Sequence, residues 1–224
     1  MCGRFTLKSP AESIASLFEG LEVPEWIPRY NIAPTQQAPT VRYRAGKPIF
    51  TALRWGLVPS WAKELAVGNR MINARSETVD SKPAFRDAFQ KRRCLIVADG
   101  FFEWKNVGKR KFPFYITRVD GRPFCMAGLW ESWGPPGAQI ETCTILTTVA
   151  NARLEPLHER MPVLVAPENY GTWLDNRFCA KSDLLDLLRP SSSEELTLRE
   201  VSRLVNKVAN DHPACIEPEP TLFD

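Results

Sequence analysis

The second residue of this 224-residue chain is a cysteine, and its position offers chemistry that an internal cysteine lacks. Aminopeptidases remove an initiating methionine when the next residue is small, so the processed chain would begin at Cys2 with an amine and a thiol on adjacent carbons. An α-amine has a pKa of about 8, so part of it is neutral at physiological pH and can attack an aldehyde to form a Schiff base. The thiol can then close onto the imine carbon in an intramolecular step and give a five-membered thiazolidine. The alternative is that Cys2 is an incidental terminal residue.

Two further residues are candidates for proton transfer. His158, one of two histidines, lies in a charged, proline-containing segment (155–162), and its near-neutral pKa suits a general acid or base. Glu103 stands among bulky aromatic residues in segment 99–105, where partial desolvation would raise the pKa of its carboxyl group. The alternatives are an exposed surface histidine and a solvent-facing acid on an amphipathic strand.

Three more residues are candidates for ligand contacts. Asn73 and Arg75 are two positions apart in an irregular segment, so an extended backbone would aim both at one ligand. Asn73 would orient an amine or a sugar hydroxyl, and Arg75 would hold a phosphate through two hydrogen bonds. Trp61, in a loop with proline and serine before it, would stack on bases or wedge between them. The alternative is a tryptophan folded back over the core.

Composition limits the function classes. The net charge is only +3, so the argument for nucleic acid rests on arginines and lysines placed beside aromatic residues, which is compatible with one basic face or with ordinary solvated charge. No apolar run approaches the ~20 residues of a membrane helix, and no secretory signal is visible, so we expect a cytoplasmic protein, nucleoid-associated in a bacterium. The six cysteines (Cys2, Cys94, Cys125, Cys143, Cys179 and Cys215) form no C-x-x-C pair, so we expect no metal, no cofactor and no disulfide.

The pattern of apolar residues and turn signals predicts one α+β domain over residues 1–224, with a mainly antiparallel, barrel-like β core flanked by short helices. Ser9, as a helix cap, begins a short helix that ends at Gly20. Residues 56–80 are predicted to form a long functional loop, and Asp120-Gly121 is predicted to be a hairpin turn between two strands. The other predicted helices are 82–92, 168–174 and 181–189, a helical turn is expected at 151–157, and the predicted strands are 38–44, 49–55, 94–98, 101–105, 111–118, 123–131, 140–149, 161–165 and 196–201.

Several short motifs together resemble the SOS-response-associated peptidase (SRAP) family, whose members are also described as abasic-site-processing proteins. These motifs occur in the family's order from residue 1 to beyond residue 200, so the resemblance spans essentially the whole chain. One departure is visible, because residues 62–70 lack the second consecutive tryptophan of some bacterial members. The matching stretches are MCGRF (1–5), RYNIAP (29–34), WGLVPSW (55–61), INARSET (72–78), ADGFFEWK (98–105), LHERMP (157–162) and VSRLVN (201–206).

The resemblance implies catalytic roles for four residues. Cys2 would be the nucleophile that forms the thiazolidine with the ring-opened sugar of an abasic site, once Met1 is lost. Asn73 would position the reacting amine and sugar. Glu103 would be the acid or base that assists crosslinking and its reversal, and His158 would help to open the sugar or to protonate the Schiff base.

The resemblance also implies DNA contacts. Arg4, Arg75 and Thr147 would touch the sugar or the phosphates near the lesion, and Trp61 would separate the flanking duplex from the single strand. The expected partner is therefore single-stranded DNA with an abasic site, including junctions between single and double strands, bound by a monomer.

Three functions follow from these expectations. The first is a sensor and covalent trap of abasic sites with some abasic-site lyase activity, because a Schiff base also permits strand cleavage. The second is a cysteine autopeptidase that acts at its own N-terminus, with Cys2 as nucleophile and His158 as base. The third is a non-catalytic binder of single-stranded DNA, which would need the basic and aromatic residues but not Cys2, Glu103 or His158.

Overall fold

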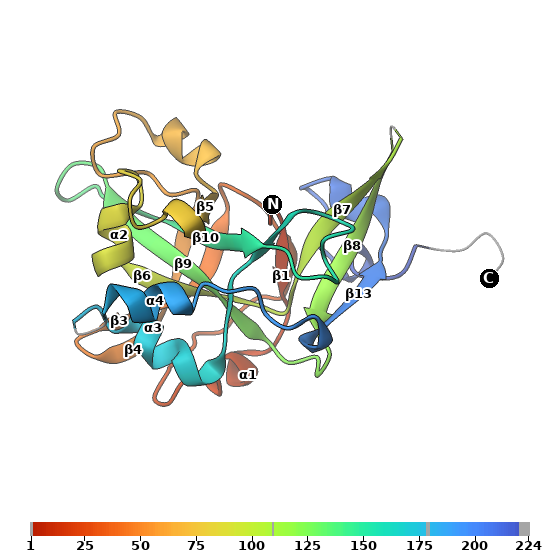
Figure 1. Ribbon diagram of the computed structural model, residues 1–224, viewed down its shortest axis with the longest axis horizontal. Coiled ribbons are helices and arrows are strands. Elements are labelled where there is room, and N and C mark those ends of the chain that lie inside the picture. The colour runs from red at the N-terminus through yellow and green to blue at the C-terminus, as the bar shows by residue number, and fades with distance from the viewer. Residues whose placement is uncertain (1, 109, 178–179, 220–224) are drawn as a thin grey trace.

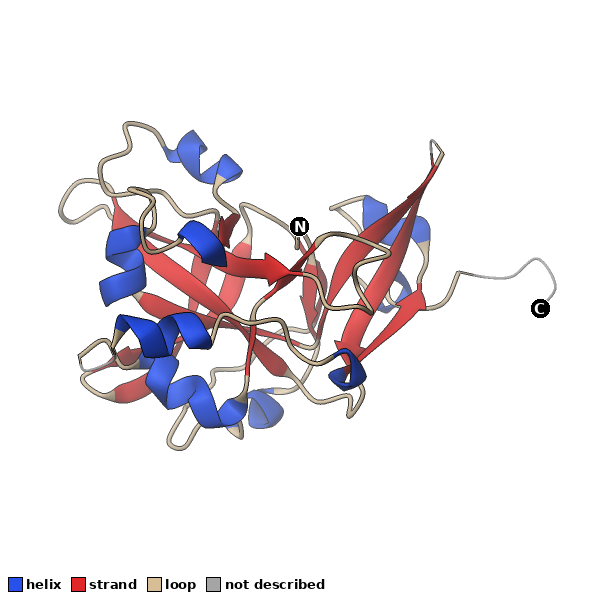
Figure 2. Ribbon diagram, in the orientation of Figure 1, coloured by secondary structure: helices blue, strands red, loops and turns tan. Residues whose placement is uncertain are grey.

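Two β-sheets lie side by side, and the N-terminal end of the chain lies between them (Figure 1). The computed structural model describes residues 2–108, 110–177 and 180–219, and Cys179 lies outside them. Strands predominate, while the helices are short and gather mainly around the larger sheet (Figure 2). The protein therefore has a mixed α+β fold that is mostly sheet, as the sequence predicts.

The smaller sheet has five strands in the order β13-β8-β7-β1-β2, and every pairing in it is antiparallel. Its central strand β7 runs between β1 and β8, so the first residues of the chain lie directly beside the strand that carries Glu103. The strands are β1 (Phe5–Leu7), β2 (Arg29–Ile32), β7 (Gly100–Val107), β8 (Arg110–Arg118) and β13 (Leu196–Glu200).

The larger sheet follows the order β11-β10-β4-β3-β6-β9-β12, and β5 pairs with β10 beside this path. An additional pairing between β9 and β10 closes a ring through β10, β4, β3, β6 and β9. The smaller sheet is open, so the barrel-like core stays a prediction. The strands are β3 (Gln37–Arg44), β4 (Lys47–Trp55), β5 (Asn73–Arg75), β6 (Arg93–Ala98), β9 (Phe124–Trp133), β10 (Ile140–Val149), β11 (Arg160–Pro162) and β12 (Leu164–Val165).

The helices cover the ends and one face of the larger sheet (Figure 1). Arg93, 1% exposed, fastens two of them, because its guanidinium donates to the carbonyls of Phe89 and Gln90 within α2 and to those of Trp173 and Asp175 at the end of α3. The α-helices are α1 (Ala11–Ala15), α2 (Arg86–Lys91), α3 (Tyr170–Leu174) and α4 (Lys181–Asp186). The 3₁₀ turns are η1 (Leu65–Arg70), η2 (Ser76–Thr78), η3 (Pro167–Asn169), η4 (Ser193–Glu195), η5 (Arg203–Asn206) and η6 (Pro213–Cys215).

A buried aromatic contact joins the two sheets next to the first residues of the chain. Phe5 of β1 packs edge-on against Trp55 of β4, with ring centroids 5.2 Å apart. On the other side of β1, the hydroxyl groups of Thr6 and Tyr115 share a hydrogen bond of 2.7 Å. Gly100 permits this arrangement, because a Cβ there would lie 2.5 Å from two carbons of the Tyr115 ring. The start of the chain is therefore held on both sides.

Three local predictions are wrong. Asp120-Gly121 does not close a hairpin, because β8 pairs with β7 and β13 while the following strand β9 pairs with β6, β10 and β12. Ser9 does not cap α1; its hydroxyl donates to the Asp99 carboxylate at 2.5 Å, and the helix begins at Ala11. Residues 56–80 are not a featureless loop, since they contain η1, β5 and η2.

Candidate functional site

Cys2 lies at the seam between the two sheets, with no exposed surface. Two neighbouring segments fix it: the Phe102 amide donates to the Arg4 carbonyl at 3.0 Å, and Phe5 pairs with Phe101. The Cys2 thiol points back toward the Arg4 carbonyl, 3.9 Å away. Burial raises the pKa of this thiol well above its ordinary value, and the negative charge of Glu103 raises it further, so the thiol is protonated at neutral pH.

Asn73 binds the backbone of Cys2 from the opposite sheet. Its side-chain Nδ2 donates to the Cys2 carbonyl at 2.9 Å, which ties β5 to the start of β1. Its Oδ1 is buried and accepts no hydrogen bond from the described residues. A buried acceptor without a donor is costly in the free protein, so this oxygen is a ready partner for an N–H or O–H group that arrives at Cys2.

Glu103 lies on β7, opposite Phe114 of β8, and is 3% exposed. Burial raises the pKa of its carboxyl group above the ordinary range. A carboxyl group with a raised pKa can give and take a proton closer to neutral pH than an exposed glutamate. The prediction that the aromatic surroundings desolvate Glu103 agrees with its position.

His158 stands at the end of a turn-rich segment between β10 and β11, with its backbone N–H donating to the Leu154 carbonyl at 3.0 Å. Its ring Nδ1 accepts a hydrogen bond of 2.9 Å from the Arg160 backbone N–H. The neutral ring therefore carries its hydrogen on Nε2. Partial burial lowers the pKa of His158 below its ordinary value, so the ring is mostly neutral at neutral pH.

Arg4 connects the site to the last described segment of the chain. Its Nη1 donates to Asn31 Oδ1 at 2.9 Å and to the Val205 carbonyl at 2.8 Å, and its guanidinium lies 5.9 Å from the centre of the Trp104 ring. Arg4 is half-buried. The Trp104 indole N–H in turn donates to Asn206 Oδ1 at 2.7 Å. These partners of Arg4 thus all lie on the side of the smaller sheet, in β2, β7 and η5.

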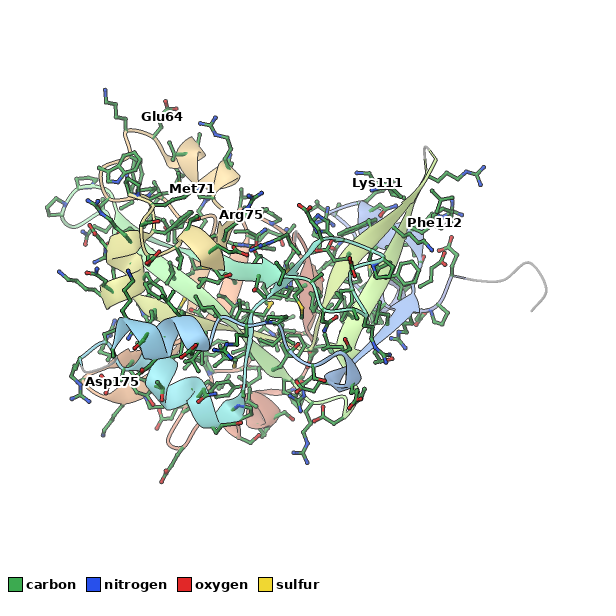
Figure 3. The ribbon with its side chains drawn as sticks, in the orientation of Figure 1. Glu64, Met71, Arg75, Lys111, Phe112 and Asp175 are labelled. Atoms are coloured by element: carbon green, nitrogen blue, oxygen red, sulfur yellow. The ribbon has the colours of Figure 1, made fainter. Side chains whose placement is uncertain are left out.

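A cleft of about 650 Å³ opens beside these residues. It brings together Glu103 of β7, His158 from the loop before β11, and Arg4, with Trp104 and Lys111 on the hairpin that forms its far wall. Figure 3 shows Lys111 on that hairpin and Arg75 on the other side of the N-terminal end in this view. The other lining residues are Gly3, Asn106 and Asn206.

The three remaining residues that are predicted to contact DNA differ in their exposure. Arg75 is exposed at the end of β5, where it pairs in register with Thr147 of β10. Thr147 itself is fully buried, and its hydroxyl donates to the Ala74 carbonyl at 3.4 Å. Trp61 is 61% exposed in the loop before η1, outside the cleft lining. Their contacts with DNA stay predictions, and in this conformation a contact through the Thr147 side chain has no open surface.

Two pairs at the site were not singled out from the sequence. Arg160 binds Glu77 through two hydrogen bonds, one of them 2.9 Å long, and Trp104 binds Asn206. Each member lies inside one of the short motifs quoted above, and all but Asn206 lie within two positions of a residue that was singled out. The only sequence signal was the opposite charge of Glu77 and Arg160, which does not identify partners 83 positions apart.

The described residues contain no cluster of three or more His, Cys, Asp or Glu side chains that could hold a metal ion. Within the described ranges, no helix has the length and apolar character that crossing a bilayer requires.

A family model described as "SOS response associated peptidase (SRAP)" matches residues 1–208. The chain belongs to the SRAP family. Relatives named "Abasic site processing protein" include YoqW of Bacillus subtilis, 41% identical over 97% of this chain and 99% of its own length. YedK of Escherichia coli is 32% identical over 97% of this chain and 100% of its own, and HMCES of Gallus gallus is 32% identical over 87% and 69%.

Solved structures share the fold of this chain. A protein of Bacteroides thetaiotaomicron superposes with a TM-score of 0.84 at 24% identity and covers 98% of this chain and 100% of its own, which supports the fold alone. A protein of Bordetella bronchiseptica superposes with a TM-score of 0.74 at 26% identity, covering 90% of this chain and 100% of its own. Relatives whose names describe abasic-site processing therefore match nearly the whole of this SRAP chain.

Proposed function

We propose that this protein traps abasic sites in single-stranded DNA by forming a thiazolidine through Cys2 after Met1 is removed. The observation that carries the proposal is the hydrogen bond from Asn73 to the Cys2 carbonyl beside a buried, raised-pKa Glu103. A residue that merely ended the chain would not need a polar anchor from one sheet and a buried acid from the other. The names of the relatives suggest the substrate, because the ring-opened sugar of an abasic site carries an aldehyde that the Cys2 amine would attack.

The proposed reaction conserves atoms and needs no oxidant or reductant. The neutral amine of processed Cys2 attacks C1′ of the ring-opened sugar, and loss of one water gives the imine. The thiol sulfur then adds to the same carbon while its proton passes to the nitrogen, which closes the ring. Closure is fast because amine and thiol belong to one residue, so the second step is intramolecular.

The surrounding groups divide the proton transfers. Asn73 Oδ1, buried without a donor among the described residues, accepts a hydrogen bond from the Cys2 amine or the sugar and aligns the attack. Glu103 acts as the acid or base for loss of water and for the reverse reaction. His158, with its hydrogen on Nε2, donates to the sugar oxygen as the ring opens.

The DNA is proposed to lie along the cleft as a single strand bound by a monomer. Arg75, exposed at the end of β5, would hold a phosphate, whereas Arg4 faces the cleft from the seam. Trp61, 61% exposed, would stack against the first pair of a flanking duplex, which makes a junction between single and double strands a substrate. The protein would act in the cytoplasm, and on the nucleoid in a bacterium.

Abasic-site lyase activity is a side path of the same imine. Before the ring closes, loss of a C2′ proton from the imine expels the 3′ phosphate and breaks the strand. The closed thiazolidine has no imine to acidify C2′, so crosslinking protects the strand. The autopeptidase is the second candidate, favoured by the family description, and would use the same Cys2 as a nucleophile.

A denaturing gel tests the proposal. Protein whose loss of Met1 has been verified by mass spectrometry is mixed with a single-stranded oligonucleotide that carries one abasic site. We expect a heat-stable, slower band that requires both the lesion and Cys2, a band lost in Cys2→Ala, and in Cys2→Ser only an imine that borohydride must reduce before it survives heating. Absence of a stable band from mature protein would refute the trap and leave the binder or the peptidase.

A further inference from the structure

The segments that carry Asn73 and His158 lie on opposite edges of one strand, β10. Thr147 of β10 pairs with Arg75 of β5 on one edge and with Pro162 of β11 on the other. Asn73 begins β5, and His158 lies two residues before β11. Pairing with β10 fixes the register of both segments along that strand. It does not fix the side chain of His158, which lies outside β11 in a turn.

A single side chain crosses β10 and joins the two edges. Arg160, whose side chain is 10% exposed, reaches over Thr147, donates to the Thr147 carbonyl at 2.5 Å, and binds both carboxylate oxygens of Glu77 in η2. The hydrogen bonds of the Arg160 guanidinium hold the pKa of Glu77 below its usual range, so Glu77 stays ionised. The backbone N–H of the same Arg160 is the donor to His158 Nδ1.

We infer that Glu77 is a positioning residue, which acts through Arg160 to hold the His158 ring at the cleft with its Nε2–H directed to the substrate. The planar guanidinium matches the two carboxylate oxygens, so the pair fixes direction as well as distance. Because η2 follows β5 directly, the same contact keeps His158 at a constant separation from Asn73. This inference rests on the proposed function for the identity of the reaction, but the hold on His158 is a property of the free protein.

The chain offers a matched control. Glu141 makes the same two-oxygen contact with Arg42, a side chain 6% exposed, and Glu141 lies on β10 at the end away from Thr147. Replacing Glu141 by Gln therefore breaks a comparable ion pair at the other end of β10. It leaves the contact between Arg160 and His158 in place.

The first test needs no DNA. The hydrogen bond between the Arg160 amide nitrogen and His158 Nδ1 should give a scalar coupling between these nitrogens in the NMR spectrum of ¹⁵N-labelled protein, and with only two histidines its assignment is direct. We expect the coupling in the wild type and in Glu141→Gln, and its loss in Glu77→Gln. An undiminished coupling in folded Glu77→Gln would overturn the inference whatever the protein's activity is.

The second test uses the single-turnover rate of adduct formation with an abasic-site oligonucleotide. Glu77→Gln should slow it about 10- to 100-fold, since a displacement of about 1 Å at a reacting group can cost about 100-fold. Glu77→Asp, which keeps the charge, should fall between the wild type and Glu77→Gln, and Glu141→Gln should stay within about twofold of the wild type.

A double substitution separates positioning from general loss of structure. If Glu77 acts through His158, then Glu77→Gln should slow a His158→Gln protein by less than about twofold. Equal losses in both backgrounds would refute the inference. If the wild type forms no adduct while the coupling is still lost in Glu77→Gln, the proposed function fails and the positioning contact stands.

Discussion

Replacing Asn73 by alanine removes a side chain with two polar groups that we propose have separate tasks. Its Nδ2 donates to the Cys2 carbonyl at 2.9 Å, and its Oδ1 is buried without a donor from the part of the chain that the structure describes. The first bond exists before the reaction, so losing it frees Cys2 to move. In the proposed reaction the second bond is formed only when the amine or the sugar arrives, so losing it would remove an interaction specific to the reacting complex.

The expected loss follows from these two bonds. A buried group left without its partner costs about 1–3 kcal/mol, and about 1.4 kcal/mol is a factor of ten in rate, so Asn73→Ala should slow adduct formation about 5- to 150-fold. Asn73→Asp keeps the acceptor but replaces the donor with a carboxylate that repels the Cys2 carbonyl. If anchoring Cys2 is the larger task, Asn73→Asp should be at least as slow as Asn73→Ala.

The assay is the single-turnover rate of the heat-stable band under excess protein, with the mature N-terminus verified for every variant. Asn176→Ala, at an exposed asparagine outside the cleft, serves as the control and should match the wild type. An Asn73→Ala protein with unchanged thermal stability and a rate within about twofold of the wild type would refute the reasoning. In that case Cys2 would be held well enough by β1 and β7 alone.

Three further predictions concern buried groups. Because burial raises the folded-state pKa of Glu103, the folded protein binds this proton more tightly than the unfolded chain and loses stability as pH rises through that pKa. Glu103→Gln should therefore have a higher melting temperature than the wild type at pH 8, and the difference should shrink at pH 4. The same variant should form its adduct more slowly. Thr147→Val removes a buried hydroxyl that donates to the Ala74 carbonyl, so urea unfolding should show a loss of about 1 kcal/mol, with affinity for an abasic-site oligonucleotide unchanged if Thr147 does not contact DNA. Gly100→Ala would place a Cβ 2.5 Å from the Tyr115 ring and should cost about 1–3 kcal/mol in the same unfolding experiment, whereas Gly121→Ala, with no atom within 4 Å, should show only the smaller cost of its positive φ.

The sequence predicted elements well where local pattern decides the structure. The apolar run at 94–98 is strand β6, six buried residues from Arg93 to Ala98, and the strand expected at 38–44 is β3. Asp120-Gly121 shows the limit of such reasoning. A turn signal predicts that the chain reverses, but partner choice depends on packing far along the chain, and here β8 and β9 pair in different sheets.

The site shows the same limit. The sequence suggested Cys2, Asn73, Glu103 and His158 one by one, from residue type and from the resemblance, but no spacing could show that Asn73 binds the Cys2 backbone from the opposite sheet. Ser9 also illustrates why local signals fail. Its hydroxyl had two possible partners, and the Asp99 carboxylate competed successfully with the helix terminus because a charged acceptor forms the stronger hydrogen bond.

The burial of Cys2 has different consequences for the two reactions proposed for its thiol. A cysteine peptidase needs the thiolate, and burial together with the charge of Glu103 raises the pKa of this thiol, so the anion is disfavoured. Among the described residues its hydrogen bond goes to the Arg4 carbonyl rather than to an imidazole base. Ring closure makes a smaller demand, because the imine carbon is already electrophilic and the thiol proton moves only to the adjacent nitrogen. A thiol kept neutral until an imine forms beside it is also shielded from other electrophiles, which suits a residue that reacts once.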